Sequence, residues 1–243
     1  LGLGGMVSTF SRWESLDRLS LYGGQWALER VEDLMNVVLR GGEVDMAIDM
    51  VAVRPGVIWQ DSSMEITAFP VSHRGPGCFG YVFRELSRRP FLEDRAEALG
   101  VPRGPERRQL VEGQSITLPD GRVVTPGDVL GDDVPGVKIV HVGDCGRTEN
   151  LDEVCRGADA LVIEATYLSA EQEMAARFGH LTALQAAELA ARAQVKQLFL
   201  VHISRRYAER DIKHEARAVF PDTHVPRDLD VYRITKGQAE RIE

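Results

Sequence analysis

This 243-residue sequence has few cysteines, few lysines and no long apolar run. No stretch approaches the about 18 consecutive apolar residues of a membrane-spanning helix, so we predict no membrane association. The three cysteines, Cys78, Cys145 and Cys155, show no C-x-x-C spacing. That excludes a disulfide scaffold and a cysteine zinc knuckle, and it indicates a cytoplasmic protein with reduced thiols. The formal net charge of −8 excludes a uniformly basic protein that coats nucleic acid, but not a local basic patch.

The N-terminal third predicts one helix followed by short strands. Apolar residues recur at helical spacing in residues 25–40, and the pair Gly41-Gly42 ends this pattern. Short β-rich runs separated by proline and glycine predict strands of an antiparallel or mixed sheet at residues 50–53, 57–60, 64–69 and 78–83.

Residues 84–136 differ in composition from the rest of the chain, because they hold six of the eleven prolines. We predict one short helix at 92–99 and one hairpin that turns at Pro119-Asp120-Gly121. Few residues here can build a large core, so the segment is interpreted as an excursion from the main domain.

From residue 136 onward, short apolar runs alternate with amphipathic segments. The predicted strands are 137–142, 160–163 and 198–201, and the predicted helices are 149–156, 170–178, 183–193 and 208–219. Continuous apolar runs of this length are typical of strands buried on both faces, which gives an α/β fold with sheets inside and helices outside.

Charged and imidazole side chains follow these buried strands. Asp144, Glu164 and His202 each stand where a predicted strand ends, and functional groups in α/β sheets gather at the carboxyl ends of strands. His73 and His180 lie in segments with adjacent glycine, V-S-H-R-G and G-H-L-T. Carboxylate oxygens and imidazole nitrogens suit zinc or manganese, so these residues form a candidate metal site.

Each of these residues also has a purely structural interpretation. Asp144 would cap the following helix. His202 would be a hydrogen-bonded structural histidine, and Glu164 would pair with an arginine. His180 would stand at the start of a helix that Thr182 caps.

Five ordered segments together resemble the motifs of the ribonuclease Z family, the tRNA 3′-processing endonucleases. The resembling segments are 71–81 (VSHRGPGCFGY, the third metal motif), 143–145 (GDC, the GDT motif), 164–166 (EAT, the HEAT motif), 179–183 (GHLTA, the GHSTA motif) and 202–207 (HISRRY, the H-x-S-x-R-Y motif). Cys145 stands where the family has threonine, and Ile163 stands where it usually has histidine. The resemblance runs over almost the whole chain.

The resemblance implies a metallo-β-lactamase fold, a four-layer αββα sandwich, as a single domain over residues 1–243. It also implies two zinc ions, with manganese as the alternative metal. His73 would bind one zinc ion, His202 the other, and Asp144 would bridge both. The family's H-x-H-x-D-H motif precedes a G-L-x-G segment that residues 2–5 (GLGG) resemble. We therefore expect that motif upstream of Leu1, and a fold whose first strands lie outside residues 1–243.

The implied reaction is hydrolysis of a phosphodiester on the 3′ side of the acceptor stem of precursor tRNA. By this resemblance, His180 would donate a proton to the leaving oxygen, and Glu164 would orient its imidazole. An imidazole exchanges protons near neutral pH, which suits this role. The resemblance also implies a homodimer.

The excursion resembles the family's protruding tRNA-binding arm, which we place at residues 88–130. The candidate RNA contacts are Gly104, Pro105, Arg103, Arg107 and Arg108. Guanidinium groups on an arm bring positive charge to phosphates without making the whole protein basic. The structural alternative is a solvated arginine-rich surface, because the chain has 25 arginines and only 4 lysines throughout.

Two other functions compete with tRNA processing. One is a small-molecule phosphodiesterase of the same fold, which has no need of a long arm. The other is a non-catalytic tRNA-binding subunit, because this chain contains only three of the metal ligands that the resemblance implies.

Overall fold

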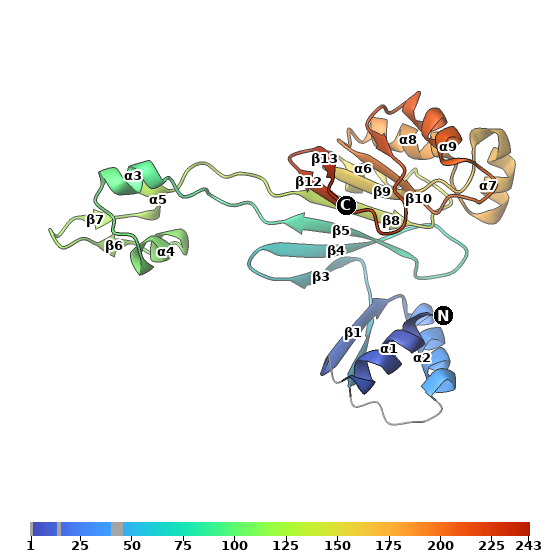
Figure 1. The fold of residues 1–243 in the computed structure, drawn as a ribbon, viewed down its shortest axis with the longest axis horizontal. Coiled ribbons are helices and arrows are strands. Elements are labelled where there is room, and N and C mark those ends of the chain that lie inside the picture. The colour runs from blue at the N-terminus through green and yellow to red at the C-terminus, as the bar shows by residue number, and fades with distance from the viewer. Residues whose placement is uncertain (1, 14–15, 40–45) are drawn as a thin grey trace. The chain divides into compact units, whose positions relative to one another are not determined.

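The computed structural model describes residues 2–13, 16–39 and 46–243, and the chain divides into two compact units (Figure 1). The main unit comprises Leu1–Arg84 and Val137–Glu243, and the inserted unit comprises Glu85–Gly136. The inserted unit occupies the stretch that the sequence marks as an excursion. Within the described ranges, no helix is both long and apolar enough to span a bilayer.

A seven-stranded mixed sheet forms the centre of the main unit. In order across the sheet its strands are β11 (Thr223–His224), β10 (Leu198–Val201), β9 (Ala160–Glu164), β8 (Lys138–Gly143), β5 (Phe79–Glu85), β4 (Met64–Pro70) and β3 (Gly56–Gln60). Strands β8 to β11 are parallel, whereas β5 pairs antiparallel with β8, and β3 with β4. The predictions of strands in these six longer segments and of an α/β fold class are confirmed.

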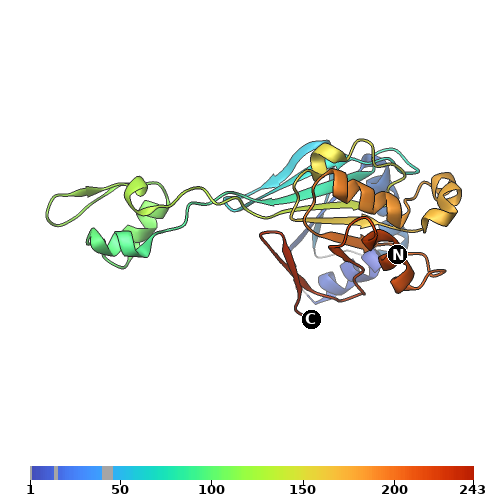
Figure 2. The same cartoon turned by 90° about the horizontal axis from the view of Figure 1, so that it is seen from above.

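The parallel half of the sheet is covered by helices. They are α6 (Asp152–Cys155), α7 (Gln172–Phe178), α8 (Ala183–Arg192) and α9 (Glu209–Arg217), with a 3₁₀ turn, η1 (Ser169–Glu171), before α7. Figures 1 and 2 show α8 and α9 on one face of the sheet, and α8 packs on β9 and β10. The helix α8 begins with a capping box, in which Thr182 and Gln185 bond each other's backbone N–H group.

Side chains between α8 and the sheet form the main core. Leu161, Leu198 and Leu200 are fully buried, and burial of each stabilises the fold by roughly 1.5–3 kcal/mol. The face that α8 turns to the sheet is rich in alanine, with Ala186 and Ala190 fully buried. Small side chains let the helix approach the strands closely, which fixes the loops at the strand ends.

The first 52 residues form a small α/β element of the main unit. Its elements are α1 (Gly2–Arg12), β1 (Arg18–Gly23), α2 (Gln25–Leu39) and β2 (Ala47–Ala52), and β1 pairs parallel with β2. The predicted helix at 25–40 is confirmed as α2 as far as Leu39, and its predicted end at Gly41-Gly42 lies outside the described residues. The helix α1 was not predicted because its sequence is rich in glycine, yet Gly4 has a structural role. A Cβ atom there would lie 3.0 Å from Val38, so glycine lets the two helices pack closely.

The inserted unit has a small core of its own. Its elements are α3 (Glu93–Ala98), α4 (Pro105–Val111), β6 (Ile116–Thr117), β7 (Val123–Val124) and α5 (Pro126–Val129). The predicted helix and hairpin are confirmed as α3 and as β6 with β7. The buried core residues are Ala96, Val101, Leu110, Ile116, Leu118, Val124 and Val129.

The chain ends in a hairpin that the sequence did not reveal, formed by β12 (Tyr232–Thr235) and β13 (Gln238–Arg241). Tyr232 packs edge-on against the rings of Phe199 and His224, which stack on each other. These ring contacts hold the hairpin against the β10–β11 edge of the sheet.

Candidate metal centre

The fold brings the five predicted catalytic and metal-site residues to one place. Asp144 follows β8, Glu164 ends β9 and His202 follows β10, while His73 lies in the β4–β5 loop and His180 between α7 and α8. Asp144 oxygens lie 3.9 Å from His73 Nε2 and 3.4 Å from His202 Nδ1. The ring centroid of His180 lies 5.2 Å from that of His73 and 5.2 Å from that of His202. The rule that functional groups gather at the carboxyl ends of strands therefore describes this chain.

Three residues at the site adopt a left-handed backbone. Gly143 and Gly179, which directly precede Asp144 and His180, each have a φ angle of 69°, and His202 has a φ angle of 54°. Glycine takes this conformation without strain, whereas histidine does so only where its surroundings hold it. The backbone at His202 is therefore a position where the fold restrains a candidate ligand.

A fully buried carboxylate organises the centre. Glu164 is 0% exposed, and four groups donate hydrogen bonds to it. Its Oε1 accepts from the Cys145 backbone N–H at 2.6 Å and from His180 Nδ1 at 2.9 Å. Its Oε2 accepts from the Thr166 hydroxyl at 2.7 Å and from the Leu181 backbone N–H at 3.1 Å. Such a set of donors is what a buried carboxylate requires.

Thr166 connects this carboxylate to His202. Its hydroxyl has two acceptors in reach, Glu164 Oε2 at 2.7 Å and the His202 carbonyl oxygen at 2.9 Å, and we assign its one proton to the carboxylate, the stronger acceptor. Its oxygen can then accept the Nδ1–H of His202, which lies 2.8 Å away. His202 then presents Nε2 as its lone-pair nitrogen. The sequence analysis named Thr166 only as part of a motif, and nothing in its residue type marks it as a link between two site residues.

The tautomers of His73 and His180 also follow from which hydrogen-bond acceptor lies at each Nδ1 atom. His73 Nδ1 lies 2.8 Å from the Gly179 carbonyl oxygen and must donate to it, so its Nε2 faces Asp144 as a lone pair. His180 Nδ1 donates to Glu164, so its Nε2 is the nitrogen available to the site. An imidazole whose second nitrogen donates to an oxygen is the usual arrangement around a protein-bound metal.

These donors fit a divalent metal ion. Two groups of side chains, one of His73, Glu164 and His180 and one of Asp144, His180 and His202, have ligand atoms within 4.8 Å of one another. Glu164 is already occupied by four donors, which leaves the histidine nitrogens and the Asp144 oxygens for a metal. Nitrogen and carboxylate oxygen are ligands that zinc prefers. Asp144 is 43% exposed, so the ligand set is accessible from outside.

The predicted RNA contacts lie in the inserted unit and have different surroundings. Arg107 is only 15% exposed, and its guanidinium lies 5.6 Å from the ring centroid of Phe91, which favours a packing role. Arg103 pairs with Glu97 and Arg108 with Glu112, and both arginines are largely exposed. Gly104 and Pro105 start α4.

The charge of the inserted unit is not basic. Residues 85–136 contain 7 arginines and 10 acidic residues, a net charge of −3. Any attraction of this unit for phosphates therefore depends on individual exposed guanidinium groups and not on its overall charge.

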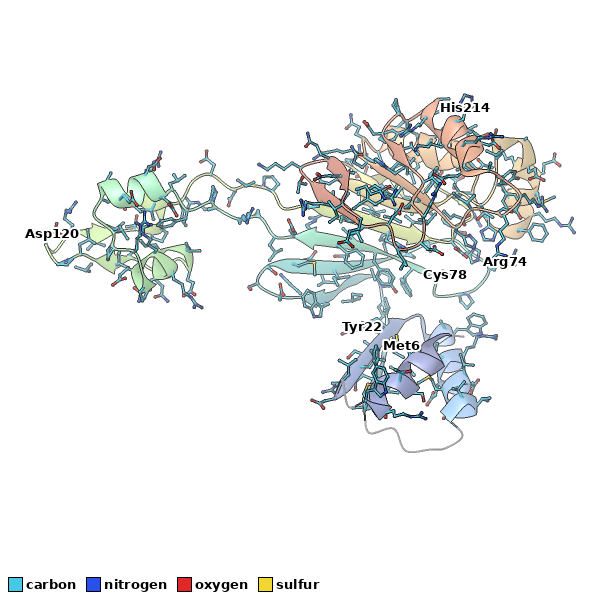
Figure 3. The ribbon with its side chains drawn as sticks, in the orientation of Figure 1. Met6, Tyr22, Arg74, Cys78, Asp120 and His214 are labelled. Carbon is cyan, nitrogen blue, oxygen red and sulfur yellow. The ribbon has the colours of Figure 1, made fainter. Side chains whose placement is uncertain are left out.

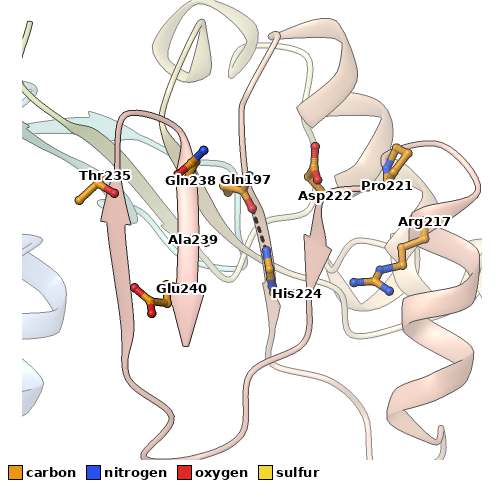
Figure 4. Close-up of a pocket in the computed structure, with 9 residues that line it drawn as sticks. All are labelled: Gln197, Arg217, Pro221, Asp222, His224, Thr235, Gln238, Ala239 and Glu240. Carbon is orange, nitrogen blue, oxygen red and sulfur yellow. Dashed lines mark hydrogen bonds between the residues drawn. The ribbon is translucent and has the colours of Figure 1, made fainter. Parts of the chain in front are cut away.

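A cavity of about 480 Å³ lies away from this centre, between α9, β11 and the C-terminal hairpin (Figure 4). Its lining includes Arg217, Glu240 and His224, whose Nε2 hydrogen-bonds Gln197. In the described part of the chain, neither group of possible metal ligands includes a residue of this cavity. The candidate centre is thus the cluster at the strand ends.

Comparisons with known proteins first define the class. Residues 103–203 match the family model of the beta-lactamase superfamily domain. A metallo-β-lactamase fold protein from Bacillus subtilis matches with a TM-score of 0.57 and 15% identity, over 90% of this chain and 66% of that chain. The short form of human tRNase Z matches with a TM-score of 0.58 and 20% identity, over 96% of this chain and 74% of that chain. The chain has the metallo-β-lactamase fold, as the resemblance implied.

A curated relative then defines the family. The ribonuclease Z of Bradyrhizobium sp. (strain ORS 278) is 41% identical over 230 residues, which are 95% of this chain and 76% of the relative. The chain belongs to the ribonuclease Z family, whose members are hydrolytic endoribonucleases with a metallo-β-lactamase fold. The resemblance that five short motifs carried is confirmed.

Proposed function

We propose that this chain is the zinc-dependent endoribonuclease that removes the 3′ trailer from precursor tRNA by phosphodiester hydrolysis. The observation that carries the proposal is the convergence of His73, Asp144, His180 and His202 in a ribonuclease Z chain. The similar human protein is named a tRNase, which supports tRNA as the substrate.

In this proposal His73, Asp144 and His202 would hold the metal, which would be two zinc ions. Bound zinc supplies an activated water as nucleophile and stabilises negative charge on the phosphate oxygens. His73 and His202 arrive in the correct tautomer, because Gly179 and Thr166 occupy their Nδ1 atoms. Manganese is the alternative metal, since the same ligand types bind it.

His180 is the proposed general acid. Its Nδ1–H is held by Glu164, so a proton on Nε2 is directed into the site. Transfer of that proton to the departing oxygen leaves a 3′-hydroxyl on the tRNA. The buried negative charge of Glu164 stabilises the imidazolium form that carries the proton.

Zinc content and turnover of the His180→Ala variant test these assignments together. We expect turnover of precursor tRNA to fall about 10²–10⁴-fold, the usual contribution of a general acid, while zinc per chain stays at the wild-type value. His224→Ala, in the separate cavity, is the control and should change neither quantity. Loss of zinc in parallel with turnover would show that His180 is a ligand and not the acid.

The inserted unit is the proposed tRNA-binding arm, with Gly104, Pro105, Arg103 and Arg108 as its accessible contacts. Phe91 and Leu130 pair at its base, so residues 92–129 can be replaced by a short glycine-serine linker. We expect the shortened chain to bind precursor tRNA more weakly but to hydrolyse a chromogenic phosphodiester at the wild-type rate. Unchanged tRNA affinity would remove the arm assignment, and a wild-type chain that cleaves only the small ester would favour the phosphodiesterase alternative.

Dimerisation and cytoplasmic location, which the family resemblance and the unpaired cysteines suggest, remain predictions. Sedimentation of the purified chain at several concentrations tests the homodimer directly.

A further inference from the structure

Two arginines from distant parts of the sequence meet at one exposed aromatic ring beside the candidate metal centre. Phe178, the last residue of α7, is 39% exposed. The guanidinium carbon of Arg74 lies 5.5 Å from its ring centroid, and that of Arg177 lies 5.7 Å away. Both distances are within the range of cation–π attraction. Figure 3 shows Arg74 on the β4–β5 loop, near α7.

Hydrogen bonds from the β4–β5 loop hold the Arg74 side of this cluster. Arg74 Nε donates a hydrogen bond to the Phe178 carbonyl oxygen at 2.8 Å. Its neighbour His73 donates to the next carbonyl, that of Gly179, at the same distance. Two consecutive residues of one loop thus bond two consecutive carbonyls at the end of α7. The guanidinium of Arg74 is therefore held in place and does not sample the solvent freely.

The two positive charges lack a carboxylate partner. Among the residues that the structure describes, neither Arg74 nor Arg177 lies within 4.0 Å of an acidic oxygen. In contrast, Arg206 on the neighbouring motif pairs with Glu171, and the exposed Arg156 pairs with Glu153. Neither charge is neutralised by a carboxylate of the described residues, so each guanidinium group can pair with an anion that a ligand brings.

The cluster adjoins the residues that would cleave RNA. Arg74 directly follows His73, and the segment Arg177-Phe178 is separated from His180 only by Gly179. An anion bound by the two guanidinium groups would therefore lie next to the metal centre and not at a remote surface.

We propose that Arg74 and Arg177, held by Phe178, bind a backbone phosphate of single-stranded RNA adjacent to the scissile phosphodiester. The inference rests on the proposed ribonuclease function and adds to it a positioning site for the substrate. Guanidinium groups suit this ligand because they bond phosphate oxygens in a bidentate manner and stack on aromatic rings. A single-stranded chain is the fitting form of RNA, because its phosphates can pair with arginines while an unpaired base can stack on an exposed aromatic ring such as Phe178.

The test is the salt dependence of RNA binding. The probe is a fluorescein-labelled single-stranded oligouridylate, with affinity measured by fluorescence anisotropy over a series of KCl concentrations. All chains carry His180→Ala so that the probe stays intact. We expect the double substitution R74Q/R177Q to weaken binding about tenfold. We also expect the slope of log K against log salt to become shallower by about 0.7, the value for one phosphate contact on a single strand.

Two further variants make the test specific. Arg156→Gln removes an exposed but paired arginine directly after α6 and should leave both affinity and slope unchanged. Phe178→Leu should weaken binding at low salt but keep the slope, because both charges remain. An R74Q/R177Q chain with wild-type affinity and slope overturns the cluster assignment alone. A parent chain that binds no RNA at all overturns the ribonuclease proposal on which the cluster depends.

Discussion

Replacement of Glu164 by glutamine removes a single charge but should destabilise the whole main unit. An amide keeps the shape of the carboxylate and offers one oxygen and one NH₂ group. Each Glu164 oxygen accepts a backbone N–H, from Cys145 at Oε1 and from Leu181 at Oε2. A backbone N–H cannot reverse its polarity. In either orientation of the glutamine, the NH₂ group therefore faces a donor, and one buried N–H loses its acceptor.

The expected cost follows from counting these bonds. An unsatisfied buried donor costs about 1–3 kcal/mol, and each hydrogen bond to a charged group that is lost contributes about 1.5–3 kcal/mol. The sum is about 2.5–6 kcal/mol, and the narrower range seen when a buried charged network is broken is about 3–5 kcal/mol. With a urea dependence of about 2 kcal/mol per molar, the unfolding midpoint should fall by about 1.5–2.5 M.

Urea unfolding followed by circular dichroism measures this shift, and amide hydrogen exchange localises it. Protection should fall at the Cys145 or the Leu181 amide, whichever faces the NH₂ group. Asp144→Asn is the matched control, because Asp144 is 43% exposed and its nearest charged neighbours in the described residues are the nitrogens of His73 and His202. In metal-free protein, that change should shift the free energy of unfolding by no more than about 0.5 kcal/mol. If Glu164→Gln unfolds at the wild-type midpoint, the account of Glu164 as the organising carboxylate is wrong.

Three other predictions follow from the same structure. Thr166→Val should release His202 Nδ1 and shift its tautomer in ¹⁵N NMR spectra, whereas Thr166→Ser should keep the wild-type spectrum; identical spectra for both variants would contradict the link. Burial raises the pKa of the Cys155 thiol to about 12, so a thiol reagent at pH 8 should modify the half-buried Cys78 in the native protein and Cys155 only after unfolding. Burial and, to a smaller extent, the positive charges of Arg217 and Lys213 lower the pKa of His224 below its ordinary value. The folded state therefore favours the neutral ring. The stability that the neutral His224 ring contributes is present above about pH 6.5 and is lost as the pH falls. The urea midpoints at pH 7.5 and pH 5.5 should therefore differ less in His224→Asn than in the wild type.

The local sequence pattern was sufficient to predict the strands that carry the site. The runs that become β8, β9 and β10 are short, apolar and bounded by glycine or charge, and burial on both faces imposes that composition wherever it occurs. The side chains that follow these strands then fall together, because parallel strands end at one edge of the sheet. The existence of the cluster was therefore predictable from single positions in the sequence.

What the sequence did not reveal depends on neighbours that are distant in the chain. Arg107 has the same residue type as Arg108, but only its position over Phe91 in the folded unit makes it inaccessible. Thr166 gains its importance from His202, 36 residues away. The segment of α1 is helical despite the low helix propensity of its glycines, because Gly4 allows close packing with Val38. In each case tertiary packing, and not the local pattern, decides the role.

Burial divides the residues of the centre into two groups with different consequences. Asp144 and His202, two of the three candidate ligands, are about half exposed, whereas Glu164 and Thr166, which orient His180 and His202, are buried. Exposed ligands contribute little to folding, so their loss should abolish metal binding and leave the fold intact. The buried pair contributes to both, because the hydrogen bonds that fix the imidazole tautomers also satisfy the backbone of two loops. The orientation of the ligands is consequently a property of the folded main unit.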